Sequence, residues 1–133
     1  MGIKAIARLA PVHIPYTISA GEAADCQIFV ADQDYEIMDV RETHSTAGAS
    51  STTLDVGISA SGTAPASLTT ALSSTFAIDS TADTPVQATL TSTLAARKMD
   101  KGEQLSLNWT GTVSAYEGAV HIVLKPIRTN TTY

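Results

Sequence analysis

The chain contains little sulfur and little charge. Cys26 is the only cysteine among 133 residues, so no disulfide can form within the chain, and the sequence gives no support for the disulfide framework of a small secreted protein. Charged residues make up 16% of the chain and leave a net charge of −5, whereas a phosphate-binding surface requires clustered Lys and Arg. We therefore expect no nucleic-acid partner.

Long apolar runs are also missing. The N-terminal stretch is interrupted by Arg8, Pro11, His13 and Pro15, so it lacks the uninterrupted apolar segment of a signal peptide. Elsewhere no run approaches the roughly 20 apolar residues of a membrane-spanning helix. We therefore expect synthesis in the cytoplasm and no membrane partner.

Residues for catalysis do not cluster along the sequence. His13, His44 and His121 are far apart, and none has a second ligand at the spacing typical of a zinc site. There is no nucleophile elbow and no phosphate-binding loop. We expect neither enzyme activity nor a cofactor.

Acidic residues gather in the segment ADQDYEIMD, residues 31–39. Alternating carboxylates can hold calcium, but the EF-hand loop requires glycine at the position that Ile37 occupies. A solvated turn is the favoured interpretation, with calcium at Asp32, Asp34 and Glu36 as the alternative.

Strand-like alternation is the dominant pattern. Short runs in which apolar and polar residues alternate are separated by loops rich in Ser, Thr, Ala and Gly. The expected strands cover residues 3–9, 27–31, 35–42, 53–59, 75–79, 86–94, 105–113 and 120–124. About eight short strands predict an all-β protein, a single-domain β-sandwich or jelly roll. A short helix is possible only at 66–74, with a further helical turn near 95–99.

The last two expected strands form a hairpin within residues 101–127. Leu105, Leu107 and Trp109 share one face of its first strand, and we expect this face to enter the core with Leu90 and Leu124. An exposed Trp109 would instead indicate a sugar-binding platform.

Two long stretches resemble small structural proteins of tailed bacteriophages. The first is IFVADQDYEIMDVRETHSTAGASSTTLDVGIS, residues 28–59, and the second covers residues 74–127. Such proteins show a Phe-Val-Ala strand, a small-residue loop with Gly and a Thr-Leu-x-Val strand. A Gly-acidic-x-Leu turn precedes their last hairpin, and here Gly102, Glu103 and Leu105 carry it.

The resemblance implies a head decoration (cement) protein. Members of this group are small β-sandwiches on the outside of an icosahedral capsid, often as trimers. It implies the major capsid protein as partner, a homo-oligomer, and a location on the capsid exterior of the virion. The alternative is a carbohydrate-binding or receptor-binding module of a phage fibre or tail.

Prolines set the N-terminal segment apart. Pro11 and Pro15 make this region extended and unsuited to a central strand. We expect an extended N-terminal arm over residues 1–18 and a β-sandwich over residues 19–133. Such an arm can add a strand to a neighbour's sheet edge. The candidate capsid or subunit contacts are Ile3, Lys4, Arg8, His13 and Tyr16.

Overall fold

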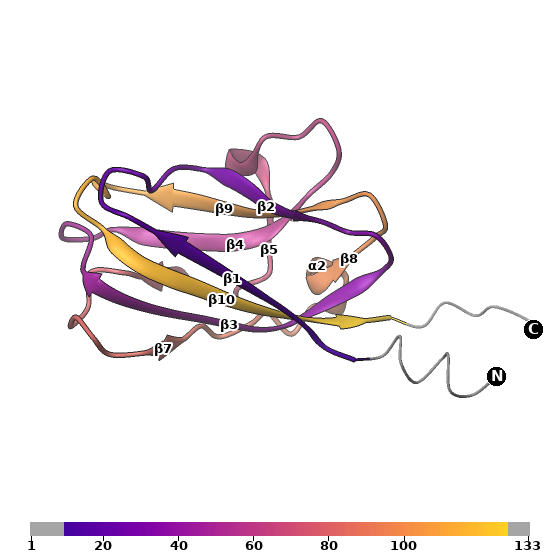
Figure 1. Ribbon diagram of the computed structural model, residues 1–133. Coiled ribbons are helices and arrows are strands. Elements are labelled where there is room, and N and C mark those ends of the chain that lie inside the picture. Colours follow the sequence, from indigo (N-terminus) through magenta and orange to yellow (C-terminus); the bar gives the residue numbers. More distant parts are fainter. Residues whose placement is uncertain (1–9, 128–133) are drawn as a thin grey trace, which may run out of the picture.

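A computed structural model describes residues 10–127, which form two five-stranded antiparallel sheets packed face to face (Figure 1). Sheet A has the order β1-β10-β3-β7, with β8 also paired to β3, and sheet B has the order β2-β9-β4-β5, with β6 also paired to β4. The strands of sheet A are β1 (Val12–Ile18), β3 (Tyr35–Thr46), β7 (Val86–Gln87), β8 (Lys98–Met99) and β10 (Glu117–Pro126). Those of sheet B are β2 (Cys26–Val30), β4 (Thr53–Ser59), β5 (Thr69–Thr70), β6 (Phe76–Ala77) and β9 (Gln104–Thr110). The predicted all-β sandwich is confirmed.

Alternate residues of each long strand enter one core between the sheets. Leu105 and Leu107 are fully buried, and Trp109, 9% exposed, lies with its ring centroid 5.1 Å from that of Tyr116. Leu124 is fully buried on the facing sheet. Burying each large apolar side chain contributes about 1.5–3 kcal/mol to stability. The prediction that this apolar face enters the core is confirmed.

The predicted hairpin, however, is wrong. β9 lies in sheet B and β10 lies in sheet A, and the segment between them crosses from one sheet to the other. Gly111 has a φ of +97° where the chain leaves β9, a conformation that glycine adopts without strain. The apolar face of a strand is buried in the core whether the next strand of the chain pairs with it in the same sheet or lies in the facing sheet. The alternation therefore predicts both strands without predicting how they are joined.

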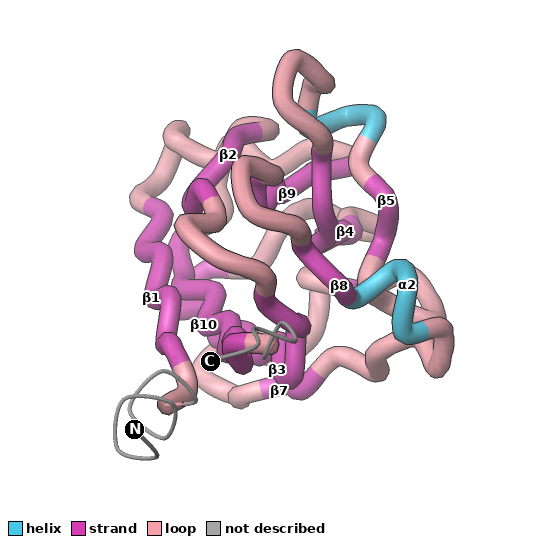
Figure 2. Tube along the Cα trace, turned by 90° about the vertical axis from the view of Figure 1, so that its right-hand side faces the viewer, coloured by secondary structure: helices cyan, strands magenta, loops and turns pink. Residues whose placement is uncertain are grey.

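The middle of the chain also differs from the prediction. In place of a helix over 66–74, the structure has a single 3-10 turn, η1 (Pro65–Ser67), followed by β5. The expected strand over 86–94 is reduced to β7, an isolated bridge between Leu72 and Leu90, and the short helix α2 (Leu94–Arg97). Segment 60–99 therefore closes one side of the sandwich, with α2 against β3, β4 and β5 (Figure 2).

The opposite side of the sandwich ends in two edge strands, β1 and β2. Residues 12–18, expected in an arm, pair with β10 along their whole length, from Val12 opposite Leu124 to Ile18 opposite Gly118. Pro15 is tolerated there because an edge strand can direct its missing N–H away from the sheet. The arm residues 1–9 and the strand predicted at 3–9 lie outside the described residues. No helix within residues 10–127 is long and apolar enough to cross a membrane.

Candidate contact surface

Strand β1 presents one side to the core and one side to the outside. Val12, Ile14 and Tyr16 are half-buried against the core, whereas His13, Pro15 and Thr17 are exposed. Because side chains alternate along a strand, the three exposed residues share the outer face of sheet A. Of the two predicted contact residues that the structure describes, His13 therefore lies on this face, while Tyr16 does not.

The outer face of sheet B is covered in part by its own chain. A Cβ built on Gly57 would lie 2.0 Å from the carbonyl oxygen of Thr69. Ser59 and Ser106 alternate with core residues of β4 and β9, so their side chains point to the outer face. Both are nevertheless buried, and their hydroxyls lie 2.5 Å apart. The segment that carries η1 and β5 thus closes part of the outer face of sheet B, whereas the outward residues of β1 on sheet A are exposed.

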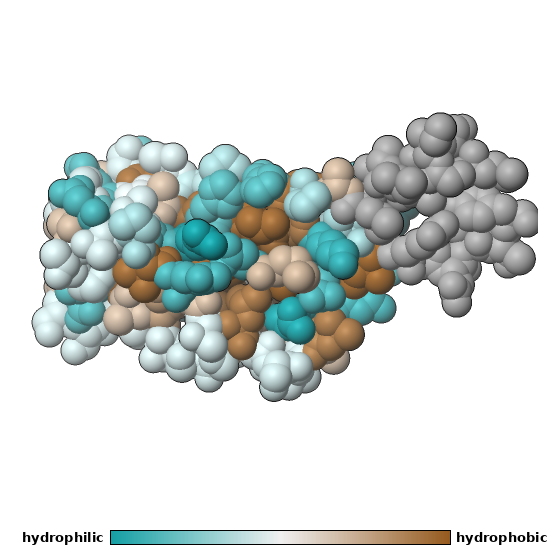
Figure 3. Space-filling view, turned by 90° about the horizontal axis from the view of Figure 1, so that it is seen from below, coloured by the Kyte–Doolittle hydropathy of each residue, from teal (hydrophilic) through white to brown (hydrophobic). Residues whose placement is uncertain are grey.

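We call this open surface the sheet A face. It is made of His13, Pro15, Thr17, Met38, Asp39, Arg41, Thr43, Gln87, Ala119, His121 and Val123, which lie on β1, β3, β7 and β10. Figure 3, a view from below Figure 1, shows apolar patches interspersed with strongly polar ones, and much surface of intermediate hydropathy at the end away from the chain termini. The face is mixed in character, without a dominant charge.

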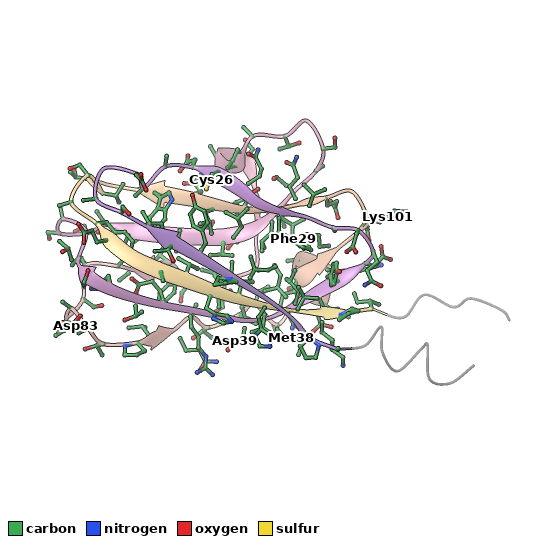
Figure 4. All side chains as sticks on the ribbon, viewed as in Figure 1. Cys26, Phe29, Met38, Asp39, Asp83 and Lys101 are labelled. Carbon is green, nitrogen blue, oxygen red and sulfur yellow. The ribbon has the colours of Figure 1, made fainter. Side chains whose placement is uncertain are left out.

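The charges of the sheet A face are largely compensated within it. Asp39 accepts a hydrogen bond from Nε of Arg41 at 2.7 Å and another from the Gln87 amide at 2.8 Å. A register shift in the β3–β10 pairing places Met38 opposite no residue. Met38, 42% exposed, and Asp39 therefore lie together on the lower side of β3 (Figure 4).

Two histidines meet on the same face. Nδ1 of His13 lies 3.1 Å from Nε2 of His121, and the two rings are nearly perpendicular, with an interplanar angle of 83°. They are 108 residues apart in the chain, and sequence reasoning found no partner for either. Both occupy outward positions of their strands, but only the pairing of β1 with β10, which the sequence does not reveal, brings them together.

Tyr16 lies instead at the opening between β1 and β2. Its hydroxyl is 3.6 Å from the sulfur of Cys26, which is half-buried. The hydrogen bond with Cys26 raises the pKa of Tyr16, and partial burial raises it further. Tyr16 thus joins the edge strands of the two sheets. The remaining candidates, Ile3, Lys4 and Arg8, lie outside the described residues.

A buried polar cluster lies on β3 at the same level of the sheet, since Val120 of β10 stands opposite Tyr16 on one side and opposite Glu42 on the other. Oε1 of Glu42 accepts a hydrogen bond from the Tyr116 hydroxyl at 2.6 Å and lies 2.7 Å from Nδ1 of His44. Nε2 of His44 lies 2.9 Å from the carbonyl oxygen of Ser80. Sequence reasoning missed this cluster because it ended the strand at residue 42, although Glu42 and His44 continue its inward phase beyond Val40.

The buried cluster favours a protonated imidazole. Burial lowers the pKa of His44, but the hydrogen bonds to Ser80 and Glu42, with the charges of Glu42 and Asp83, outweigh it and raise the pKa overall. A carbonyl oxygen only accepts, so Nε2 must donate, and an ionised Glu42 requires Nδ1 to donate as well. Both ring nitrogens are thereby engaged and the side chains are shielded from solvent. The cluster thus connects β3 by hydrogen bonds to the loop that contains Ser80 and to the loop that contains Tyr116.

The acidic segment does not converge on one point. Asp32 accepts a hydrogen bond from the Tyr35 hydroxyl, Asp34 accepts one from the Lys101 N–H, and Glu36 pairs with Arg97. Within residues 10–127, no three His, Cys, Asp or Glu side chains are grouped so that they could hold a metal ion.

Aromatic rings are not available as a sugar-binding platform in the described part. Every Phe, Tyr and Trp within residues 10–127 is buried or half-buried. A groove of about 520 Å³ lies beside η1 and α2 and is lined by residues such as Ser59, Thr63, Lys98 and Asp100. It contains no ring on which a sugar could stack.

Comparisons of the chain with protein-family models, with curated proteins and with solved structures find no match. The sheet A face, the edge strands and the buried cluster are therefore interpreted from their own chemistry.

Proposed function

We propose that this chain is a structural virion protein that decorates and stabilises the outside of an icosahedral phage capsid. It binds the lattice of the major capsid protein, as a homo-oligomer and most simply as a trimer. The observation that carries the proposal is the sheet A face, an open surface that ends in edge strand β1. The resemblance of residues 27–127 to tailed-phage decoration proteins supports the same function.

The chemistry of the sheet A face suits a broad contact between proteins. Asp39 is held by Arg41 and Gln87, so this carboxylate would keep its partners when another protein covers the face. Met38 and Val123 supply apolar surface among these polar groups. Stable interfaces bury roughly 1,200–2,000 Å² in total and combine an apolar centre with a polar rim.

The N-terminal residues extend this contact in the proposal. β1 begins at Val12 at the edge of sheet A, so a contact made by residues 1–9 would be joined through the chain to that edge. Ile3, Lys4 and Arg8 would contact a neighbouring subunit or the capsid, and His13 on the sheet A face would join them. Three such sites on one trimer would bind with an avidity on the order of a hundredfold or more above that of one site.

The proposal is tested by incubating the purified chain with undecorated capsids of the phage that carries this sequence. Cryo-electron microscopy should show extra density at regular positions on the outer surface, and decorated capsids should rupture at a higher temperature. A capsid surface that stays bare at saturating protein would remove the decoration function. A glycan array, read in parallel, would detect the carbohydrate-binding alternative.

A further inference from the structure

We propose that His13 and His121 form a binding site for a late first-row transition-metal ion, with Zn²⁺ as the reference ion. The site lies on the sheet A face and does not depend on the capsid function. Its carrying observation is the separation of 3.1 Å between Nδ1 of His13 and Nε2 of His121.

The backbone holds the two histidines at a fixed spacing. In the antiparallel pairing of β1 with β10, His13 stands opposite Val123 and His121 stands opposite Pro15. The two side chains are therefore diagonal neighbours on one face of a continuous ladder. The entropy of bringing two ligands together is lost when the sheet folds and not when the metal binds. This favours chelation by both rings over binding by one.

The nitrogen separation is close to what a metal ion requires. Zinc–nitrogen bonds are about 2.0–2.1 Å long, so two imidazoles on one tetrahedral ion have nitrogens about 3.3–3.4 Å apart. The ring centroids, 5.3 Å apart, show that the two facing nitrogens point nearly at each other. Binding therefore needs a modest rotation of the rings, and both side chains are exposed and free to make it.

Proton movement on binding is simple. In the metal-free pair, one facing nitrogen donates its N–H to the lone pair of the other. Both facing nitrogens must present lone pairs to a metal ion, so the donor ring shifts its proton to its far nitrogen. For two neutral rings this is a change of tautomer with no net release of a proton, and no oxidant or reductant is involved.

The surroundings tolerate a cation. Arg41, the neighbour of His121 on β3, is paired through Nε with Asp39, so its charge is offset, and the whole chain carries a net charge of −5. The residues described provide no third ligand in the group, so water or a group from another molecule fills the other coordination positions. Imidazole favours Zn²⁺, Ni²⁺ and Cu²⁺ over the hard ions Mg²⁺ and Ca²⁺.

The test is calorimetric titration of the full chain with ZnCl₂ in a buffer that does not bind zinc. We expect one zinc ion per chain at this site, tighter binding of Cu²⁺ than of Zn²⁺, and no binding of Mg²⁺. The variants are His13→Gln, His121→Gln and the double variant, with Thr17→Ala on the outward side of β1 as the matched control. All three substituted positions are exposed, so the melting temperature without metal should stay near that of the parent.

Chelation predicts a specific pattern among these variants. Each single variant should lose at least tenfold in zinc affinity, the double variant should lose little more than either single one, and Thr17→Ala should bind as the parent does. Imidazole NMR signals of His13 and His121 should shift together and saturate at one equivalent of zinc. Unchanged affinity in His13→Gln or in His121→Gln would overturn the proposal. Independent binding, with one ion lost per histidine removed, would overturn it equally.

Discussion

The hydroxyl of Tyr116 donates a hydrogen bond of 2.6 Å to Oε1 of Glu42, although the two residues are 74 positions apart. Tyr116 belongs to the segment that carries the chain from sheet B to sheet A, and Glu42 lies on the inward side of β3. Both side chains are fully or almost fully buried. This contact fixes the crossing that replaces the predicted hairpin.

The first prediction concerns this hydrogen bond. Tyr116→Phe removes the donor and leaves the buried Glu42 carboxylate short of one partner, so the free energy of unfolding should fall by about 1–3 kcal/mol. Urea denaturation followed by tryptophan fluorescence measures the loss, since Trp109 lies beside Tyr116. Tyr35→Phe is the control: its hydroxyl bonds to the exposed Asp32, so a smaller loss is expected. Equal losses in the two variants would contradict a special role for the Tyr116 contact.

The second prediction concerns the core position of Trp109. Trp109→Ala empties a buried aromatic site and should lower the free energy of unfolding by about 3–5 kcal/mol. Leu94→Ala, at a site 53% exposed on α2, should change it by no more than about 0.5 kcal/mol. If Trp109→Ala melts like the parent, Trp109 is a surface residue and the sugar-binding alternative gains support.

The third prediction concerns the pH dependence of stability. The pKa of His44 is raised in the fold because, although burial lowers it, the hydrogen bonds to Ser80 and Glu42 and nearby negative charge outweigh that effect. The group binds its proton more tightly when folded, so its contribution is fully present below the unfolded pKa of about 6.5 and is lost as pH rises through the raised value. The stability advantage of the parent over His44→Gln should therefore shrink between pH 6 and pH 9.

Denaturation midpoints at several pH values measure this advantage. Glu42→Gln serves as the control, because it removes the charge that helps to raise the pKa of His44. In the Glu42→Gln background, the His44→Gln change should show a weaker dependence on pH. An advantage that grows with pH would mean that His44 is neutral in the fold.

The fourth prediction tests the covering of sheet B. Gly57→Ala places a Cβ 2.0 Å from the backbone carbonyl of Thr69, and backbone cannot move aside as a flexible side chain can. Overpacking of this kind should cost about 1–3 kcal/mol. Thermal melting measures it, and Ala60→Gly, just beyond the end of β4, gives a reference for an exposed change. A neutral Gly57→Ala would show that segment 65–70 does not lie on the sheet.

The strands were predictable where a single physical pattern determined them. Residues 53–59 alternate strictly, and β4 has those bounds. Residues 66–74 contain Ala and Leu, which favour a helix locally, but tertiary contact with Gly57 and the pairing of β5 with β4 override that propensity. Local patterns report which face of a strand is buried, and they carry no information about which strands are neighbours.

In the candidate site, too, the exposure of single residues was predictable from the sequence and their partners were not. His121 alternates with the apolar Val120 and Ile122 in the sequence, and it is exposed on β10. Its meeting with His13 and the meeting of Glu42 with Tyr116 both depend on contacts between residues 108 and 74 positions apart. Such pairings are set by the topology of the sandwich, so composition and spacing alone could not supply them.

The fifth prediction concerns the N-terminal segment. Deleting residues 1–9 removes Ile3, Lys4 and Arg8 but leaves every described strand intact, so the melting temperature of the free protein should not change. Deleting residues 1–16 also removes five of the seven residues of β1, which exposes the edge of β10 and takes away half-buried residues that pack on the core, such as Ile14. That longer deletion should destabilise the sandwich itself.

The two deletions separate the role of the arm from the role of the fold. If residues 1–9 contact a neighbour, their deletion should weaken capsid binding at each site. On a trimer, a tenfold loss at each of three sites compounds to as much as about a thousandfold. Capsid co-sedimentation and the rupture temperature of decorated capsids measure the effect, and the double variant Lys4→Gln, Arg8→Gln shows how much of it is charge. The protein lacking residues 1–9 retains the sheet A face. If it still occupies every capsid site and protects capsids from rupture as well as the parent, the sheet A face alone makes the contact.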